Sequence, residues 1–255
     1  MQDLVGGFGS GGVFVLGGSG DLGGAICRSF ARAGVPVALS YRSDAEAAAL
    51  LARGILSEGG DAAVFQLDAA DRQAIGVTLQ KAAQRMNGLH SIVYAAGPAF
   101  DPEFFSNTDL STWRQWVDGD LLAAISLAQA AIPHLRKSHG AFLALTTYQA
   151  NMIEVRGGVS AISKAAVDRM IAVLAKEEGR YGVRANSLRC GWVNTESNQK
   201  IFAELPNLRD EKQRSIPLGR LGQPEEIGEA VVFLCSRRAG FITGANLIAD
   251  GGESL

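Results

Sequence analysis

A hydroxyl and an amine stand four residues apart at Ser160 and Lys164, within a stretch that is typical of a helix. This spacing places both side chains on one face of that helix. A lysine next to a hydroxyl could support general acid–base chemistry or stabilise a developing negative charge. The alternative is structural, because a lone helical lysine usually reaches solvent and a buried serine usually bonds to the backbone.

Two glycine-rich clusters could hold phosphate groups. The first, Gly7-Phe8-Gly9-Ser10-Gly11-Gly12, precedes the first predicted strand and cannot aim a helix N-terminus at a phosphate, so we interpret 1–12 as a flexible lead-in. The second runs from Gly17 to Gly23, between that strand and a helix. Glycines there let the backbone approach a pyrophosphate while free helix N–H groups attract the anion. A glycine-rich turn without a ligand is the alternative, and the position after a strand favours binding.

The end of the second predicted strand, Ser40-Tyr41-Arg42-Ser43, indicates which dinucleotide binds. Folds that prefer NAD(H) usually carry an acidic residue here, whereas an arginine accommodates the 2′-phosphate of NADP(H). Arg42 therefore predicts NADP(H), and a solvated surface charge is the alternative. Asp68 follows the third predicted strand, where it could contact the adenine or form a turn.

Apolar runs alternate with helix-length amphipathic stretches along the whole chain. We expect strands at 13–16, 35–40, 62–67, 91–95, 141–146, 183–188 and 246–249, and helices at 22–33, 44–58, 71–86, 111–136, 158–181 and 224–235. This order predicts an α/β fold: one single-domain, doubly wound (Rossmann-type) parallel sheet of about seven strands with helices on both faces. The weakly periodic segment 196–222 is predicted to be a mobile insertion on the substrate side.

The composition is that of an ordinary globular domain. The 255 residues fit one domain, and a net charge of −2 with scattered basic residues argues against nucleic-acid or membrane-surface binding. We find no apolar run of about 18 residues and no signal-peptide pattern. The three cysteines and three histidines show no disulfide or metal-ligand spacing. These features predict a cytoplasmic protein with no metal.

Several motifs together resemble the short-chain dehydrogenase/reductase family over nearly the whole chain. Its glycine motif T-G-x-x-x-G-x-G corresponds to 16–23, with Leu16 and Asp21 in place of a threonine and a glycine. Its N-N-A-G and P-G motifs correspond to Tyr94-Ala95-Ala96-Gly97 and Cys190-Gly191. The series 217–220, 222–227, 242–244 and 250–252 is similar to the bacterial acyl-carrier ketoreductase branch. The resemblance implies cofactor contacts from Gly17, Ser19, Gly20, Asp21, Leu22, Gly23, Tyr41, Arg42, Ser43, Asp68, Ala95, Ala96, Gly97, Lys164, Gly191, Val193 and Thr195.

The resemblance also implies four catalytic positions, which the family fills with Ser, Tyr, Lys and Asn. Here Lys164 is kept, while Thr147, Ser160 and Asp120 stand at the Ser, Tyr and Asn positions. In the family the tyrosine protonates the substrate oxygen as hydride arrives, and the lysine lowers the pKa of that tyrosine and holds the nicotinamide ribose. A seryl hydroxyl is far less acidic than a phenol, so Ser160 cannot simply replace the tyrosine.

The altered site leaves three interpretations open. We favour NADP(H)-dependent reduction of a carbonyl on a small molecule or an acyl thioester, with Tyr148, Tyr94 or a water bound to Lys164 as the proton source. The second is reduction of a C=C bond, because the 2,4-dienoyl-CoA reductases of this family also carry Ser-x-x-x-Lys and take their proton from a tyrosine near the position of Tyr148. The third is nucleotide binding without hydride transfer.

The helices predicted at 111–136 and 158–181 are long and rich in Ala, Leu and Ile. In the first of them, apolar residues spread over more than half the circumference, whereas a helix covered by one sheet face needs a single apolar stripe. The family packs these helices across a two-fold axis. The resemblance therefore implies a homodimer or homotetramer.

Overall fold

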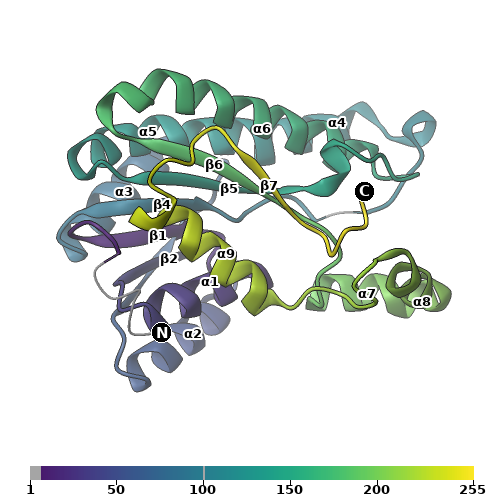
Figure 1. Ribbon diagram of the computed structural model, residues 1–255, viewed down its shortest axis with the longest axis horizontal. Helices are drawn as coiled ribbons and strands as arrows, with labels where there is room; N and C mark the ends of the chain where they lie inside the picture. The colour runs from purple at the N-terminus through teal and green to yellow at the C-terminus, as the bar shows by residue number, and fades with distance from the viewer. Residues whose placement is uncertain (1–6, 100) are drawn as a thin grey trace.

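The computed structural model describes residues 7–99 and 101–255, which form a three-layer α/β structure (Figure 1). Its sheet has seven parallel strands in the order β3-β2-β1-β4-β5-β6-β7. The predicted doubly wound fold is confirmed. The strands are β1 (Gly12–Leu16), β2 (Val37–Tyr41), β3 (Ala62–Gln66), β4 (Leu89–Tyr94), β5 (Ala141–Thr147), β6 (Arg184–Cys190) and β7 (Asn246–Ala249).

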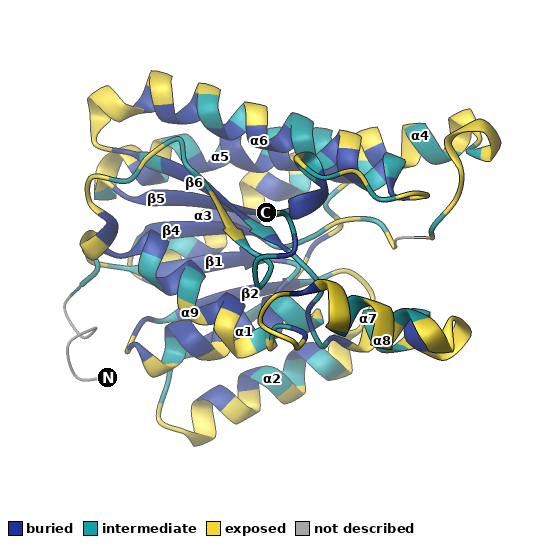
Figure 2. Cartoon of the chain, turned by 45° about the vertical axis from the view of Figure 1, so that its right-hand side comes forward, coloured by how far each residue is buried: buried dark blue, intermediate teal, exposed yellow. Residues whose placement is uncertain are grey.

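Helices cover both faces of this sheet, as Figures 1 and 2 show. One face packs against α1 (Asp21–Arg32), α2 (Ala45–Ser57) and α9 (Pro224–Cys235), and the other against α3 (Arg72–Arg85), α5 (Ala123–Ser138) and α6 (Gly158–Glu178). Strand β1 alternates between these two cores, with Val13 and Val15 in the first and Phe14 and Leu16 in the second. A strand buried on both faces needs this continuous apolar run. Short 3₁₀ turns occur at Phe105–Asn107, Tyr148–Ala150, Gly179–Tyr181 and Arg237–Ala239.

The helix predicted at 111–136 differs from the observed structure. It consists of α4 (Leu110–Trp116), a π-helical turn (Val117–Leu122) and α5. A π turn shifts the register of side chains and is common at functional sites. Hydrophobic periodicity does not register such a shift, because the apolar pattern continues on either side of it. The turn carries Asp120, which is fully buried.

The segment 196–222 contains two helices, α7 (Glu196–Glu204) and α8 (Pro206–Ser215), where the sequence predicted only an irregular insertion. Phe202, Ile216 and Leu221 form a small apolar core beneath them. Charged residues dominate α8, which weakens its apolar periodicity. That this segment is mobile stays a prediction.

The predicted lead-in also needs revision. Gly12 already belongs to β1, and the Phe8 ring stacks on His90 with centroids 5.0 Å apart, so the stretch 7–12 packs against the sheet. Residues 1–6 of the predicted lead-in lie outside the described residues. Of the helices in the described ranges, none combines the length and apolar character needed to cross a bilayer.

Candidate active site

Two glycines in and next to the loop between β1 and α1 leave no room for a side chain. Gly17 has φ +80°, and a Cβ on it would lie 2.7 Å from the carbonyl oxygen of Ala95. A Cβ on Gly23 would lie 2.1 Å from the carbonyl oxygen of Gly17. These close approaches bring the N-terminus of α1 up to the carboxyl ends of β1 and β4, where ligands of doubly wound sheets bind.

A cleft of about 690 Å³ opens beside this loop, and a second hollow of about 330 Å³ continues from it. The two share Gly20, Gly97 and Ser197 in their walls. The structure brings together around them all the cofactor residues implied by the sequence. Lining the first are Gly17, Ser19, Gly20, Tyr41, Arg42, Ser43, Asp68, Ala95, Ala96 and Gly97, and lining the second are Asp21, Leu22, Gly23, Lys164, Gly191, Val193 and Thr195.

Arg42 lies at the wall of the first cleft, just past the end of β2, and is exposed. Its guanidinium makes no ion pair within the described ranges 7–99 and 101–255. The nearby Asp44 is engaged elsewhere, because its carboxylate caps α2 by accepting from the N–H of Ala47 at 2.8 Å. The arginine is therefore available to an anionic ligand.

Lys164 lines the second hollow and is held by a buried carboxylate. Its Nζ lies 2.6 Å from Oδ1 of Asp120 and donates to the carbonyl oxygen of Ala96 at 3.2 Å. Asp120 is 0% exposed and also accepts from the Tyr94 hydroxyl at 2.8 Å and from the Ser163 hydroxyl at 2.7 Å. A buried charge is tolerated only when it is paired and hydrogen-bonded in this way.

Tyr94 lies behind this ion pair and is itself fully buried. Burial raises the pKa of its phenol well above the usual value, and the neighbouring Asp120 carboxylate raises it further. The phenol therefore stays protonated and keeps donating to Asp120. Tyr94 acts as a support for the carboxylate, and it does not line either part of the cleft.

Thr147 and Ser160, the two remaining positions implied by the family, do not line the cleft. The Thr147 hydroxyl accepts from the N–H of Gln149 at 3.3 Å and caps the short turn after β5. Ser160 is partly buried in the first turns of α6, four residues before Lys164. Thr146, the residue before Thr147, does line the cleft, but its hydroxyl donates to Asp168 at 2.9 Å.

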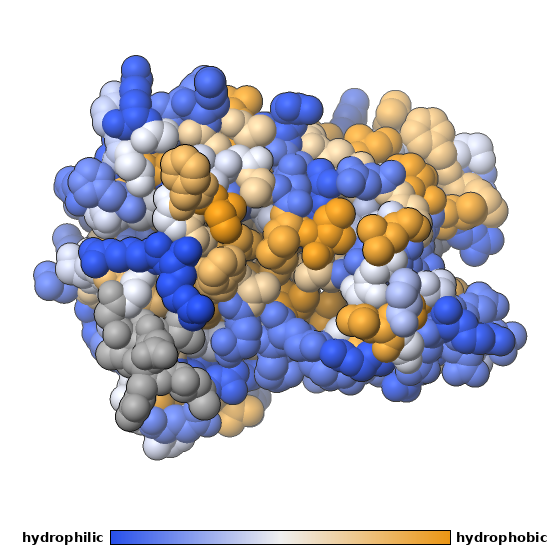
Figure 3. Space-filling model, in the orientation of Figure 1, coloured by the Kyte–Doolittle hydropathy of each residue, from blue (hydrophilic) through white to orange (hydrophobic). Residues whose placement is uncertain are grey.

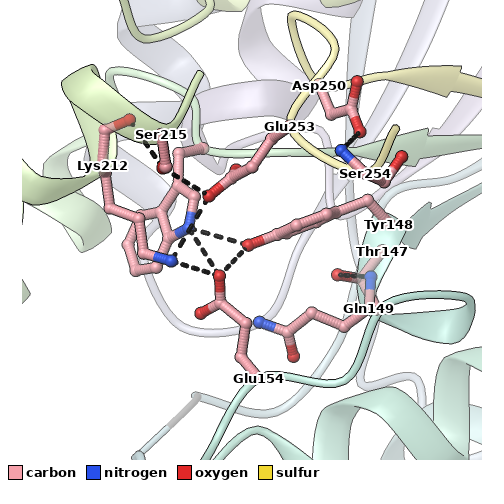
Figure 4. A network of polar contacts seen from close by, with 10 residues as sticks. Thr147, Tyr148, Gln149, Glu154, Lys212, Ser215, Asp250, Glu253 and Ser254 are labelled. Atoms are coloured by element: carbon pink, nitrogen blue, oxygen red, sulfur yellow. Dashed lines mark hydrogen bonds and ion pairs between the residues drawn. The ribbon is translucent and has the colours of Figure 1, made fainter. Parts of the chain in front are cut away.

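Tyr148 belongs to a different cluster, on the side of α8 and the C-terminus (Figure 4). Its hydroxyl donates to Glu154 and accepts from Nε1 of Trp192 at 2.9 Å. Burial and the Glu154 carboxylate both raise the pKa of Tyr148. Among the hydrogen bonds of the residues that the structure describes, none joins Tyr148 to Lys164 or Ser160.

A lysine and two carboxylates complete this second cluster. Lys212 of α8 forms ion pairs with Glu154 and with Glu253, the latter at 3.3 Å. Ser215 donates to Glu253 at 3.0 Å (Figure 4). Burial raises the pKa of Glu253, although Lys212 opposes the shift. Sequence reasoning missed these partners, because single charged residues in loops and helices carry no local signal of pairing.

Cys190 also lines the second hollow and was not expected to have a chemical role. Burial raises the pKa of its thiol to about 12, so the thiol is neutral and a poor nucleophile. No group of three or more metal-binding side chains comes together in the described part of the chain.

Comparison with known proteins places this architecture in a family. The family model described as Enoyl-(Acyl carrier protein) reductase matches residues 19–254. The chain is 32% identical to 3beta-hydroxysteroid dehydrogenase 1 of Eggerthella lenta over 95% of this chain and 93% of that protein, and 31% identical to L-fucose dehydrogenase of Oryctolagus cuniculus over 95% and 84%.

Solved structures agree with these relatives. A short-chain dehydrogenase/reductase from Serratia marcescens superposes with a TM-score of 0.90 at 27% identity, covering 98% of this chain and 100% of that one. A short chain dehydrogenase from Burkholderia cenocepacia, in complex with NADP, superposes with a TM-score of 0.89 at 25% identity and the same coverage. The protein therefore belongs to the short-chain dehydrogenase/reductase family.

Proposed function

We propose that this protein is an NADP(H)-dependent oxidoreductase that interconverts a carbonyl and an alcohol on a small-molecule substrate. The observation that carries the proposal is the position of Lys164, which lines the same continuous cleft as the glycine loop and is fixed there by Asp120. The names of its relatives, dehydrogenases of a hydroxysteroid and of L-fucose, support chemistry between an alcohol and a carbonyl.

The cleft fits a dinucleotide that carries a 2′-phosphate. The glycine loop leaves room for a diphosphate at the N-terminus of α1, and Arg42 with Ser43 would hold the 2′-phosphate. Asp68 would face the adenine, and Gly191 would lie toward the nicotinamide end. When bound, the nicotinamide ring supplies or accepts the hydride.

Lys164 is the group best placed to donate a proton to the substrate oxygen. Ser160 is too weak an acid, and the Tyr148 phenol donates to Glu154 outside the cleft. The Lys164 ammonium would stabilise negative charge on the substrate oxygen and pass a proton to it directly or through a water. Asp120 would hold the Lys164 ammonium in position toward the substrate oxygen, and the hydroxyls of Tyr94 and Ser163 would hold the carboxylate in place.

Reduction of a C=C bond receives less support from this geometry. That interpretation needs Tyr148 as the proton donor, and the hydrogen bond to Glu154 together with the raised pKa makes this phenol a poor acid. The acyl thioester substrate also stays a prediction from the resemblance. A nucleotide-binding protein without turnover is the remaining alternative, and the next experiments separate it from an enzyme.

Cofactor choice is tested by fluorescence titration with NADPH and NADH. We expect the unmodified protein to bind NADPH at least about tenfold more tightly, because a charge-assisted contact contributes roughly 1.5–3 kcal/mol. Arg42→Asp should reverse the preference, whereas Arg53→Asp, at an exposed arginine of α2, should leave it unchanged. Equal affinity of the unmodified protein for both cofactors would contradict the proposal.

Turnover is tested by following NADPH oxidation with a panel of ketones, aldehydes, oxidised sugars, oxosteroids and enoyl thioesters. The proposal expects turnover with one of the carbonyl classes. Turnover with enoyl thioesters alone would establish C=C reduction instead. NADPH binding without turnover on any class would favour the non-catalytic interpretation.

We also infer a homo-oligomer in the cytoplasm. Ile162 and Val173 of α6, and Leu110 of α4, are each about half exposed or more. On the face in Figure 3, hydrophobic side chains gather toward the end that carries α4. The buried, unpaired thiols of Cys27, Cys190 and Cys235 are compatible with a reducing compartment. A monomer of 26.8 kDa in light scattering at micromolar concentration would contradict the assembly.

A further inference from the structure

The carboxylate of Asp21 lies between the N-termini of two helices. Asp21 is the first residue of α1, directly after the glycine loop, and it lines the inner hollow of the cleft. Its Oδ2 accepts from the backbone N–H of Ser197, in the first turn of α7, at 3.3 Å. Helix N-termini attract anions, so this side chain provides an anion of the protein's own at that place.

The charges around the hollow do not offset this carboxylate. Asp21 is the one acidic residue in its wall, and Lys164 is the one cationic residue there among the described residues. The Lys164 ammonium is already paired with Asp120, at 2.6 Å. A second anion entering the hollow would therefore meet a negative side chain, with only backbone N–H groups to balance it.

We propose that the Asp21 carboxylate acts as a competing anion of the protein's own. It weakens binding of the dinucleotide diphosphate, and it ties α7 to the glycine loop in the free protein. The inference rests on the proposed binding of NADP(H). The adenosine end should not be affected, because Arg42 and Ser43 line the other part of the cleft. Asp21 thus lowers the affinity of the cleft for the diphosphate of its own cofactor without preventing the cofactor from binding.

A purely structural role for Asp21 makes a different prediction. Acidic residues in the first turn of a helix stabilise it through the helix dipole, at roughly 0.3–1 kcal/mol. In that case replacement would lower thermal stability slightly and leave nucleotide affinity unchanged. Asp21→Asn keeps an acceptor for the Ser197 N–H and removes only the charge, whereas Asp21→Ala removes both.

The test measures binding of two probes to the unmodified protein, Asp21→Asn and Asp21→Ala. The first probe is NADPH, followed by fluorescence, and the second is adenosine 2′-phosphate, which has no diphosphate, followed by calorimetry. We expect both variants to bind NADPH at least about tenfold more tightly and adenosine 2′-phosphate equally well. Asp71→Asn, at the exposed cap of α3, is the matched control and should change neither affinity.

Hydrogen exchange supplies a readout that is independent of nucleotide. In the free protein, the first turn of α7 should exchange faster in Asp21→Ala than in Asp21→Asn, because only alanine removes the acceptor. If adenosine 2′-phosphate binds and the NADPH affinity is the same in all three proteins, the proposed competition between Asp21 and the diphosphate is wrong. If neither probe binds to any of them, the proposed NADP(H) function fails instead.

Discussion

Two lysines, Lys164 and Lys212, are buried to a similar extent but differ in how their charge is balanced. The Lys164 side chain is 12% exposed and faces one carboxylate, Asp120, whose other contacts are hydroxyl donors. The Lys212 side chain is 15% exposed and faces two carboxylates, Glu154 and Glu253. The first cluster is neutral as a unit, whereas the second carries an excess of negative charge. Burial raises the pKa of Glu253, and Lys212 opposes this shift more than the Glu154 carboxylate adds to it.

The two clusters also connect different parts of the molecule. Lys164 and Asp120 join α6 to the π turn; α6 packs on β5 and β6, and Tyr94 of β4 donates to Asp120. Lys212 joins α8 to the loop after β5 and to the C-terminal residues, and α7 and α8 rest on a core of only a few side chains. Loss of the first pair should therefore affect the whole domain, and loss of the second should act locally.

The largest effect should come from Lys164→Ala. It leaves the Asp120 carboxylate buried without a counter-charge, which typically costs about 3–5 kcal/mol of unfolding free energy. Under the proposed function, turnover should also fall by about 10²-fold or more. Urea unfolding and NADPH oxidation measure the two effects.

Two controls accompany this variant. Lys176→Ala removes an exposed lysine from the same helix and should change stability by less than about 0.5 kcal/mol. The double variant Lys164→Ala/Asp120→Ala should be less destabilised than the sum of its single changes, because the unpaired charge is gone. An additive result would show that the two side chains do not form a coupled pair.

Lys212→Ala should have a smaller and more local effect. It removes the cation shared by Glu154 and Glu253, at a cost of roughly 1–3 kcal/mol. We expect faster hydrogen exchange in α7 and α8, with little change in the strands of the sheet. Lys200→Ala, at an exposed lysine of α7, is the control. Equally faster hydrogen exchange throughout the sheet would show that the Lys212 cluster does not act locally.

Glu253→Gln should change how stability depends on pH. Because the pKa of Glu253 is raised on folding, the folded protein holds its proton more tightly than the unfolded chain does. Its contribution to stability is therefore complete below the ordinary glutamate pKa of about 4.3 and is lost as pH rises through the folded value. Melting temperatures between pH 4.5 and 8 should fall with pH more steeply for the unmodified protein than for Glu253→Gln.

Two features keep this pH test specific. The Glu226 carboxylate has the opposite shift, because its hydrogen bond to Arg220 lowers its pKa to about 2, and its titration lies below the measured range. Glu225→Gln, at an exposed glutamate of α9, is the control and should reproduce the unmodified slope. Parallel pH profiles for Glu253→Gln and the unmodified protein would contradict the raised pKa.

Ser160→Ala should have the smallest effect. Ser160 does not line the cleft, so turnover should change by less than about tenfold, well below the 10²–10⁴-fold typical of a lost general acid. Tyr148→Phe should likewise keep most of the turnover, because the Tyr148 hydroxyl donates its hydrogen bond to Glu154. An inactive Ser160→Ala would make Ser160 the working hydroxyl, and an inactive Tyr148→Phe would restore the C=C interpretation.

The amino-acid sequence by itself predicted the seven strands, most of the helices and the glycine loop between β1 and α1. These features depend on neighbours along the chain: the alternation of apolar runs, and glycines spaced so that a strand can turn closely into a helix. The roles of Gly17, Gly23 and Arg42 were predicted from their positions after a strand, and in the structure these residues line the two parts of one cleft.

The surroundings of Lys164, Tyr148 and Lys212 were determined by the tertiary structure, because the contact partners of these residues are distant in sequence. Lys164 and Asp120 are 44 residues apart, as are Tyr148 and Trp192, and Lys212 and Glu154 are 58 apart. No local pattern indicates which buried carboxylate a lysine will meet. The sequence showed that Ser160 and Asp120 depart from the family. Only the packing of the π turn against α6 made Asp120 the counter-ion of Lys164. Only the tertiary contacts placed the Tyr148 hydroxyl against Glu154 and Trp192.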